Sequence, residues 1–162
     1  MLAHRIIPTI LMKKGHLVKG EGFAADRIVG NALQAAKIHA MRGVDEILML
    51  DVTATKEGRE PDYKMIEKLT KTAHVPVTVG GGVNKIEHIL KLLLAGADKV
   101  CIGTAIDLIE PAAKKFGNQC IVQSLDYPAM QPGQTVHKTE AFGAGEILLQ
   151  SILVTGPWKG TI

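Results

Sequence analysis

The sequence predicts an α/β fold in which parallel strands are joined by helices. Short apolar segments of strand length alternate along the chain with segments in which apolar residues recur at helical spacing. One joint, a glycine followed by small and polar residues that lead into a strand, occurs three times: GVDEIL at 43–48, GADKVC at 96–101 and GAGEIL at 143–148. Such alternation is typical of βαβ units, because parallel strands need a crossover connection.

The first half of the chain contains two predicted strands and two predicted helices. In order, the segments are a strand at 5–12, a loop at 13–27, a helix at 31–42, a strand at 46–51, a polar loop at 53–60 and a helix that begins near Pro61. Both strands are continuous apolar runs, as expected when both faces of a strand are covered. Gly43 provides a C-terminal stop for the first helix, and the fixed φ of Pro61 suits a first helical turn.

The second half continues the alternation and then loses it. Its segments are strands at 75–79, 99–102, 120–125 and 146–150, with helices from Asn84 to Gly96 and at 107–115. Asn84 and Glu87 form a capping-box pattern at the start of the first of these helices. Residues 127–142 are too few and too polar for a good crossover helix. We therefore expect about six parallel strands in a single domain over residues 1–162.

Composition excludes several functional classes. The net charge is +3 and the basic residues are scattered, which argues against a nucleic-acid partner. No run of apolar residues is long enough to span a membrane, and the two cysteines lie in apolar runs as reduced thiols would, so we expect a cytoplasmic protein. The six histidines show no metal-ligand spacing, and we expect neither a metal nor a cofactor.

Three consecutive glycines at 80–82 separate a predicted strand from a predicted helix. Backbone N–H groups and the positive end of the helix dipole converge at such a junction, which makes it a ready anion site. The alternative is that the glycines only form a tight strand-to-helix turn.

Charged residues stand near the starts of four predicted strands: Arg5, Glu46, Lys99 and Glu146. Charges at strand starts usually lie in solvent at the rim of a sheet. The two of each sign would instead neutralise one another if the strands closed into a barrel, and a buried cluster would need that pairing.

Together these residues make the chain resemble the cyclase subunit of imidazole glycerol phosphate synthase, a (β/α)8 TIM barrel of histidine biosynthesis. The matching segments are MLAHRIIP at 1–8, VKG at 18–20, VDEILMLDVTAT at 44–55, PVTVGGGV at 76–83, AGADKV at 95–100, FGNQCIV at 116–122 and GAGEILL at 143–149. The resemblance implies a TIM-barrel type fold that is incomplete here, with about six strands and shortened helices. It also implies a lyase that uses ammonia from a glutaminase partner to cleave and cyclise a phosphorylated ribonucleotide.

The resemblance assigns a role to individual positions. Asp126 matches a catalytic aspartate, and Asp98 matches a position that faces the glutaminase. The matched substrate and phosphate positions are Lys19, Asp51, Gly81, Gly82, Gly103, Thr104 and Gly156. The charged gate through which ammonia would enter the barrel floor matches Arg5, Glu46, Lys99 and Glu146, which favours the paired cluster over the solvated rim.

The departures from the family pattern concern the catalytic machinery. Leu11 stands where a second catalytic aspartate is expected, and a leucine cannot move a proton. Gly103 replaces an asparagine, the acidic loop expected at 151–157 has no carboxylate, and the last two βα units are absent. A related subfamily, which builds acetamidino groups on surface sugars, also lacks the first aspartate, and the segment GREPD at 58–62 is more similar to it.

Three functions are consistent with this pattern. The chain is a catalytically impaired cyclase, a non-cyclising subunit that channels ammonia for a glutamine amidotransferase, or a decayed barrel fragment without catalysis. Six strands in barrel order leave two open edges, so we also expect self-association through those edges.

Overall fold

The computed structural model describes residues 4–20, 27–127 and 142–151. Six strands run parallel to their neighbours, as predicted: β1 (Thr9–Lys13), β4 (Ile47–Asp51), β5 (Val77–Gly80), β6 (Lys99–Ile102), β7 (Ile121–Tyr127) and β8 (Glu146–Ser151). Four helices connect or flank them: α1 (Ala32–Met41), α2 (Tyr63–Ala73), α3 (Ile86–Leu94) and α4 (Ile109–Phe116). Short 3-10 turns, η2 (Ile106–Leu108) and η3 (Asn118–Cys120), precede and follow α4.

With two further strands, β2 (His16–Lys19) and β3 (Arg27–Asn31), they form one sheet in the order β3-β2-β1-β4-β5-β6-β7-β8. Within the described residues no hydrogen-bonded pairing joins β8 back to β1, so the sheet is not closed. A mostly parallel sheet with crossover helices and open edges is an incomplete TIM-barrel fold, and the predicted fold class is confirmed.

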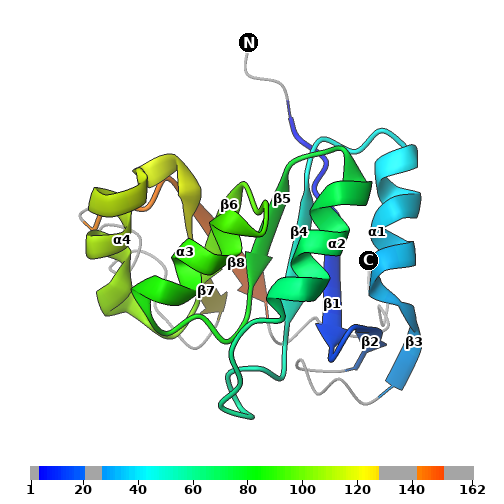
Figure 1. Cartoon of the computed structure of the whole chain (residues 1–162), viewed down its shortest axis with the longest axis horizontal. Coiled ribbons are helices and arrows are strands. Elements are labelled where there is room, and N and C mark those ends of the chain that lie inside the picture. Colours follow the sequence, from blue (N-terminus) through cyan, green and yellow to red (C-terminus); the bar gives the residue numbers. More distant parts are fainter. Residues whose placement is uncertain (1–3, 21–26, 128–141, 152–162) are drawn as a thin grey trace.

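All four helices pack on the same face of the sheet (Figure 1). Alternate strand residues point to this face and are almost inaccessible to solvent, for example Met49 on β4, Val79 on β5 and Val100 on β6. They pack with the apolar faces of the helices, which supply residues such as Ile66 and Ile89 to one continuous aliphatic core. This core holds the strands in place on the helix-covered face of the sheet.

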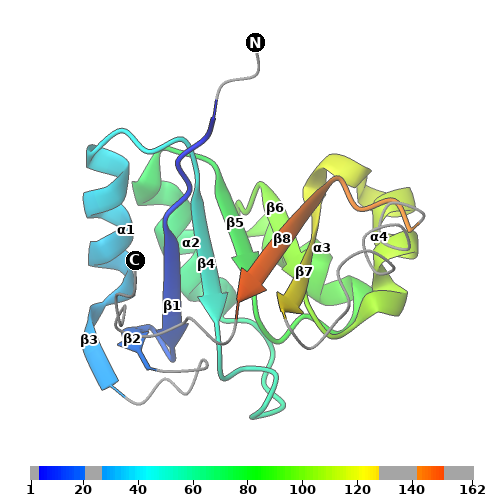
Figure 2. The ribbon, with the colours of Figure 1, turned by 180° about the vertical axis from the view of Figure 1, so that it is seen from behind.

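The opposite face carries no described helix, and β8 passes in front of it in the view of Figure 2. A smaller apolar cluster lies on this face, with Leu48, Leu50, Cys101 and Val122 buried. It corresponds to the interior of a barrel, where inward side chains stack in layers.

The prediction of a loop over 13–27 is wrong in part. The structure has β2 (His16–Lys19) there and then β3 (Arg27–Asn31), both antiparallel to their neighbours. Lys14 and Gly15 both have positive φ (48° and 84°), which is the backbone of a two-residue hairpin turn. The glycine was visible in the sequence, but the non-glycine residue at positive φ gave no signal.

Two helix starts also differ from prediction. Helix α2 begins after Asp62, whose side chain accepts a hydrogen bond from the Met65 N–H at 3.0 Å, so Pro61 precedes the helix. The capping box at Asn84 does not form, because Lys85 is the N-cap of α3 and makes no side-chain capping bond. The chain stays extended as far as Lys85, whose φ and ψ are −143° and 153°.

Among the helices of the described ranges, none is both long and apolar enough to cross a membrane.

Candidate functional site

A cavity of about 480 Å³ opens at the carboxyl ends of the parallel strands. In α/β barrels this end of the sheet carries the functional loops. The lining includes six of the residues selected from the sequence: Asp51, Gly81, Gly82, Gly103, Thr104 and Asp126. The structure therefore brings together residues that lie as far as 75 positions apart, between Asp51 and Asp126.

The glycine turn packs tightly against the chain that follows β4. Gly81 and Gly82 have φ of 103° and 73°. A Cβ on Gly81 would lie 2.2 Å from the carbonyl oxygen of Asp51, and one on Gly82 would lie 2.5 Å from that of Arg59. The tight-turn explanation therefore accounts for both glycines without a ligand. The case for an anion site rests on the other residues of the cavity.

Asp51, the last residue of β4, is buried and its carboxylate is turned back onto its own chain. Its Oδ1 accepts hydrogen bonds from the N–H groups of Thr53 and Ala54, both at 3.0 Å, and from the Thr53 hydroxyl. Arg59 donates both terminal nitrogens to Oδ2 at 3.2 Å. Asp51 lines the cavity, but most of its acceptor capacity is used to hold the β4–α2 loop.

Two side chains hold the glycine turn itself. The Gly82 N–H donates to the Thr55 hydroxyl oxygen at 3.2 Å. The carbonyl of Gly82 lies 3.1 Å from Nδ1 of the buried His88, and since a carbonyl can only accept, that nitrogen carries the proton. The turn is therefore fixed on one side by the β4–α2 loop and on the other by α3.

The far wall of the cavity is formed by β7 and β8. Asp126 is exposed and lies in register with Gln150, whose amide donates to the Ser124 hydroxyl at 2.6 Å. Burial, with a smaller contribution from the Asp126 charge, raises the pKa of the Cys101 thiol to about 12. Cys101 is therefore a protonated thiol and does not serve as a nucleophile. Among these groups, Asp126 is the one that can exchange a proton with a ligand.

An apolar layer lies beneath the cavity. Leu11 on β1 stands beside Leu50 on β4 and packs against the inner apolar cluster, together with Ile7, Val52 and Leu148. At the position that the resemblance assigns to a catalytic aspartate, the structure thus places hydrocarbon within a hydrocarbon layer.

The four charged residues form one ion-paired cluster, which we call the base cluster. Glu46, Lys99 and Glu146 stand at the starts of β4, β6 and β8, whereas Arg5 precedes β1, because the strand predicted at 5–12 begins only at Thr9. Arg5 pairs with Glu46 at 3.1 Å and with Glu146 at 3.0 Å, and Lys99 pairs with the same two carboxylates at 2.8 and 2.9 Å. Glu46 also accepts a hydrogen bond from Thr78. Exposure of the side chains rises from 4% for Glu46 to 48% for Arg5. The paired arrangement is confirmed, with Arg5 on its solvent side.

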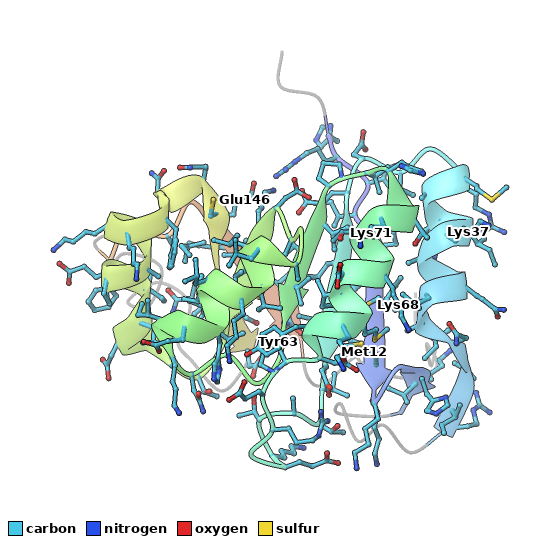
Figure 3. The ribbon with its side chains drawn as sticks, viewed as in Figure 1. Met12, Lys37, Tyr63, Lys68, Lys71 and Glu146 are labelled. Atoms are coloured by element: carbon cyan, nitrogen blue, oxygen red, sulfur yellow. The ribbon has the colours of Figure 1, made fainter. Side chains whose placement is uncertain are left out.

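Burial and pairing act in opposite directions in this cluster. Burial disfavours the charged forms of Lys99 and Glu146, but the hydrogen bonds between partners outweigh it. The pKa of Lys99 is raised and the pKa of Glu146 is lowered as a result. Both shifts favour the charged forms of Lys99 and Glu146 at neutral pH. Figure 3 places Glu146 at the opposite end of the sheet from Tyr63 and Met12, which lie near the end with the large cavity.

Three of the predicted site residues are not part of the cavity as described. Lys19 is exposed at the end of β2 and does not line it. Asp98 is exposed at the amino-terminal end of the strands, away from the cavity. Its carboxylate accepts the Val77 N–H at 2.8 Å and so caps the start of β5. Gly156 lies outside the described residues. The ligand role of Lys19 and the partner role of Asp98 stay predictions.

Sequence reasoning missed four polar residues of the cavity: Thr55, Lys56, Ser124 and Gln150. Ser124 and Asp126 are two residues apart on one strand, so the alternation of a strand could have identified Ser124. Thr55 and Lys56 stood in a polar loop whose path no pattern specified.

Polar groups gather at the carboxyl ends of parallel strands, and the described helices all cover the outer face of the sheet. These features define this protein as one of the barrel-type α/β proteins. A family model described as "Histidine biosynthesis protein" matches residues 5–161, and the chain belongs to that family.

Proposed function

We propose that this protein binds a phosphorylated small molecule in the cavity at the carboxyl ends of the strands and acts on it as an impaired cyclase-type lyase. The observation that carries the proposal is the meeting, in one cavity, of Gly103, Thr104 and the carboxylate of Asp126 beside the glycine turn. Backbone N–H groups and a hydroxyl suit a phosphate, while a carboxylate suits proton transfer.

The chemistry available to the chain is limited by what faces the ligand. Asp126 can donate or accept one proton at the far wall, but Leu11 provides no second proton carrier. Because acid–base residues contribute ~10²–10⁴-fold each, a site with one of two retains only a small part of the rate. Ammonia as a co-substrate would approach from the base cluster and cross the apolar layer in its neutral form.

The test is turnover of the bisphosphorylated ribonucleotide with ammonium salt, followed by detection of both products. We expect slow turnover that Asp126→Asn abolishes, with ligand binding preserved. An inactive protein beside an active full-length cyclase subunit would refute the catalytic part of the proposal. Failure to bind inorganic phosphate in calorimetry would refute the binding part.

The base cluster favours a second candidate, in which the protein conducts ammonia for a glutamine amidotransferase without cyclising anything. A second cavity of about 320 Å³ adjoins the cluster and is lined by Ile7, Leu48 and Val122 as well as by Arg5 and Glu146. Charges at the entrance and hydrocarbon behind them would favour neutral ammonia over ammonium, because burying an unpaired charge is costly.

This candidate predicts a stable complex with a glutaminase subunit. Asp98→Asn keeps an oxygen that can cap β5 but removes the charge, so it should weaken the complex without loss of stability. Asp45→Asn is the matched control and should leave the complex unchanged, since the Asp45 carboxylate accepts the Ile6 N–H at 2.7 Å in the same way. If neither pull-down nor glutaminase activation detects a complex for the unaltered protein, the ammonia-conducting role is excluded.

A further inference from the structure

The large cavity has charges of opposite sign on opposite walls. Three charged side chains line it: Asp51, Lys56 and Asp126. Asp51 is paired with Arg59, which also pairs with Glu57, and Glu57 in turn lies 3.7 Å from the Lys14 ammonium, so these two carboxylates face two cations. Asp126 lies on the β7 wall, and Lys56 lies on the loop that follows β4. Among the described residues Lys56 makes no ion pair, and its ammonium is available to a ligand.

The residue before Lys56 already contacts the glycine turn. The Thr55 hydroxyl oxygen accepts the Gly82 N–H at 3.2 Å, in the position where an oxygen of a bound anion would otherwise meet that donor. A hydroxyl can accept and donate at once, so its proton is left to donate to a ligand oxygen. A phosphate at this wall would therefore meet Thr55 as well as the glycines.

We propose that Thr55 and Lys56 are phosphate ligands: the hydroxyl donates a hydrogen bond to a phosphate oxygen, and the ammonium pairs with the phosphate charge. The inference rests on the proposed function, since it assumes that a phosphate binds in this cavity. It assigns the phosphate to the wall between β4 and β5. The remainder of the ligand then faces Ser124, Asp126 and Gln150.

Electrostatics supports this orientation. A phosphate beside Asp126 would meet a like charge, whereas one beside Lys56 meets an opposite charge. Polar groups of the other wall, an amide and a hydroxyl that already bond to each other, suit the uncharged hydroxyl or amino groups of a sugar or nucleotide.

The loop that carries the two residues is held in place before any ligand arrives. Arg59 clamps Asp51 with both terminal nitrogens, and backbone bonds join Arg59 to Ala54 and Glu57 to Thr53, both at 2.9 Å. Binding therefore does not have to order the backbone around Thr55, which lowers the entropic cost of association.

The test is calorimetric titration with inorganic phosphate and with ribose 5-phosphate at low ionic strength. Lys56→Gln is expected to raise the Kd for both about tenfold, because hydrogen bonds to charged groups contribute ~1.5–3 kcal/mol and ~1.4 kcal/mol is a factor of ten. Thr55→Val should raise the Kd by at least about fivefold, because it removes the donor to the phosphate, at about 1 kcal/mol, and also the acceptor of the Gly82 N–H. Thr55→Ser keeps the hydroxyl and should bind phosphate as the unaltered protein does.

Lys68→Gln is the matched control, because it makes the same change in net charge on α2, outside the cavity (Figure 3). If Lys56→Gln and Lys68→Gln both bind phosphate as tightly as the unaltered protein does, the inference is wrong and the proposed function stands. If the unaltered protein binds no phosphate at all, the proposed function fails first. Equal loss of affinity in both variants would indicate a general charge effect and would also overturn the inference.

Discussion

At Gly82 the neighbouring backbone decides which residue can be present. The carbonyl oxygen of Arg59 lies 2.5 Å from where a Cβ would be, and the backbone has a φ of 73°. Gly43, at the end of α1, has nearly the same φ of 72° but nothing within 4 Å of its would-be Cβ. The two glycines thus separate backbone strain from close packing.

We predict that Gly82→Ala destabilises the protein by clearly more than Gly43→Ala. The left-handed backbone costs an L-residue about 1–2 kcal/mol at either position, and the clash adds to this at Gly82 alone. Urea unfolding followed by circular dichroism measures both. Equal losses of unfolding free energy would mean that the β4–α2 loop retreats at little cost.

Residues such as Leu11 show what single positions reveal before a structure is known. The sequence shows that Leu11 is apolar and predicts that it lies on the first strand. The sequence does not predict that Leu11 belongs to an inner layer with Leu50 and Leu148. A parallel strand that is buried on both faces is a continuous apolar run, so the run does not tell inner from outer residues.

Among the elements, the β4–α2 loop connects the most parts of the site. It packs on the glycine turn, presents Thr55 and Lys56 to the cavity and is tied to β4 through the pair between Arg59 and Asp51. The Asp51 carboxylate is 2% exposed, so loss of its partner would leave a buried charge uncompensated.

We predict that Arg59→Gln lowers the free energy of unfolding by about 3 kcal/mol, the usual cost of removing one partner of a buried pair. Hydrogen exchange should accelerate at the amides of Glu57 and Arg59, which close the loop. Arg59→Lys should restore only part of the loss, because lysine cannot make the two-nitrogen contact. Arg42→Gln, at the exposed end of α1, serves as control, and a loss no greater than in that variant would contradict the clamp.

The repeated joint explains why so much of the fold was predictable. Its glycines, at 43, 96 and 143, all have positive φ, and its fourth residue in each copy is a member of the base cluster: Glu46, Lys99 or Glu146. Helix starts were less predictable. Helix α2 begins after Asp62 and not at Pro61, and α3 begins after Lys85 and not at Asn84. The hairpin of β1 and β2 was missed because its turn needs Lys14 at positive φ.

At the scale of the whole molecule, the base cluster joins strands from both ends of the chain. Glu146 has a lowered pKa in the folded protein because its hydrogen bonds to Lys99 and Arg5 outweigh the opposing effect of burial. Its ionised form therefore stabilises the fold at neutral pH. This contribution is lost as the pH falls below about 4.3 and through the lower folded value.

We predict that Glu146→Gln costs about 1–2 kcal/mol at pH 7, between the values for exposed and for buried pairs, and that the difference from the unaltered protein shrinks below about pH 4. Glu110→Gln, which breaks an exposed pair with Lys114, should cost less than ~0.5 kcal/mol at any pH. Urea titrations across pH 3–7 measure both. A constant difference across that range would show that the carboxylate charge is not what stabilises the fold.

The open sheet predicts self-association. On the edge strand β8, Leu149 is 60% exposed and points away from the cavity side. Apolar edge strands pair with other chains unless they are protected. Light scattering should give a mass above 17.4 kDa, which Leu149→Lys lowers and Leu94→Lys, an equally apolar position on α3, does not. A monomeric mass at high concentration for the unaltered protein would contradict this prediction.

In the part of the chain that the structure describes, the base cluster is the one set of ion pairs that joins the segment before β1 to β8. A ladder of backbone hydrogen bonds would fix the spacing of β1 and β8 along their length, whereas the ion pairs of the base cluster fix it only near their amino-terminal ends. We therefore expect β1 and β8 to separate more readily at their carboxyl ends than at their amino ends.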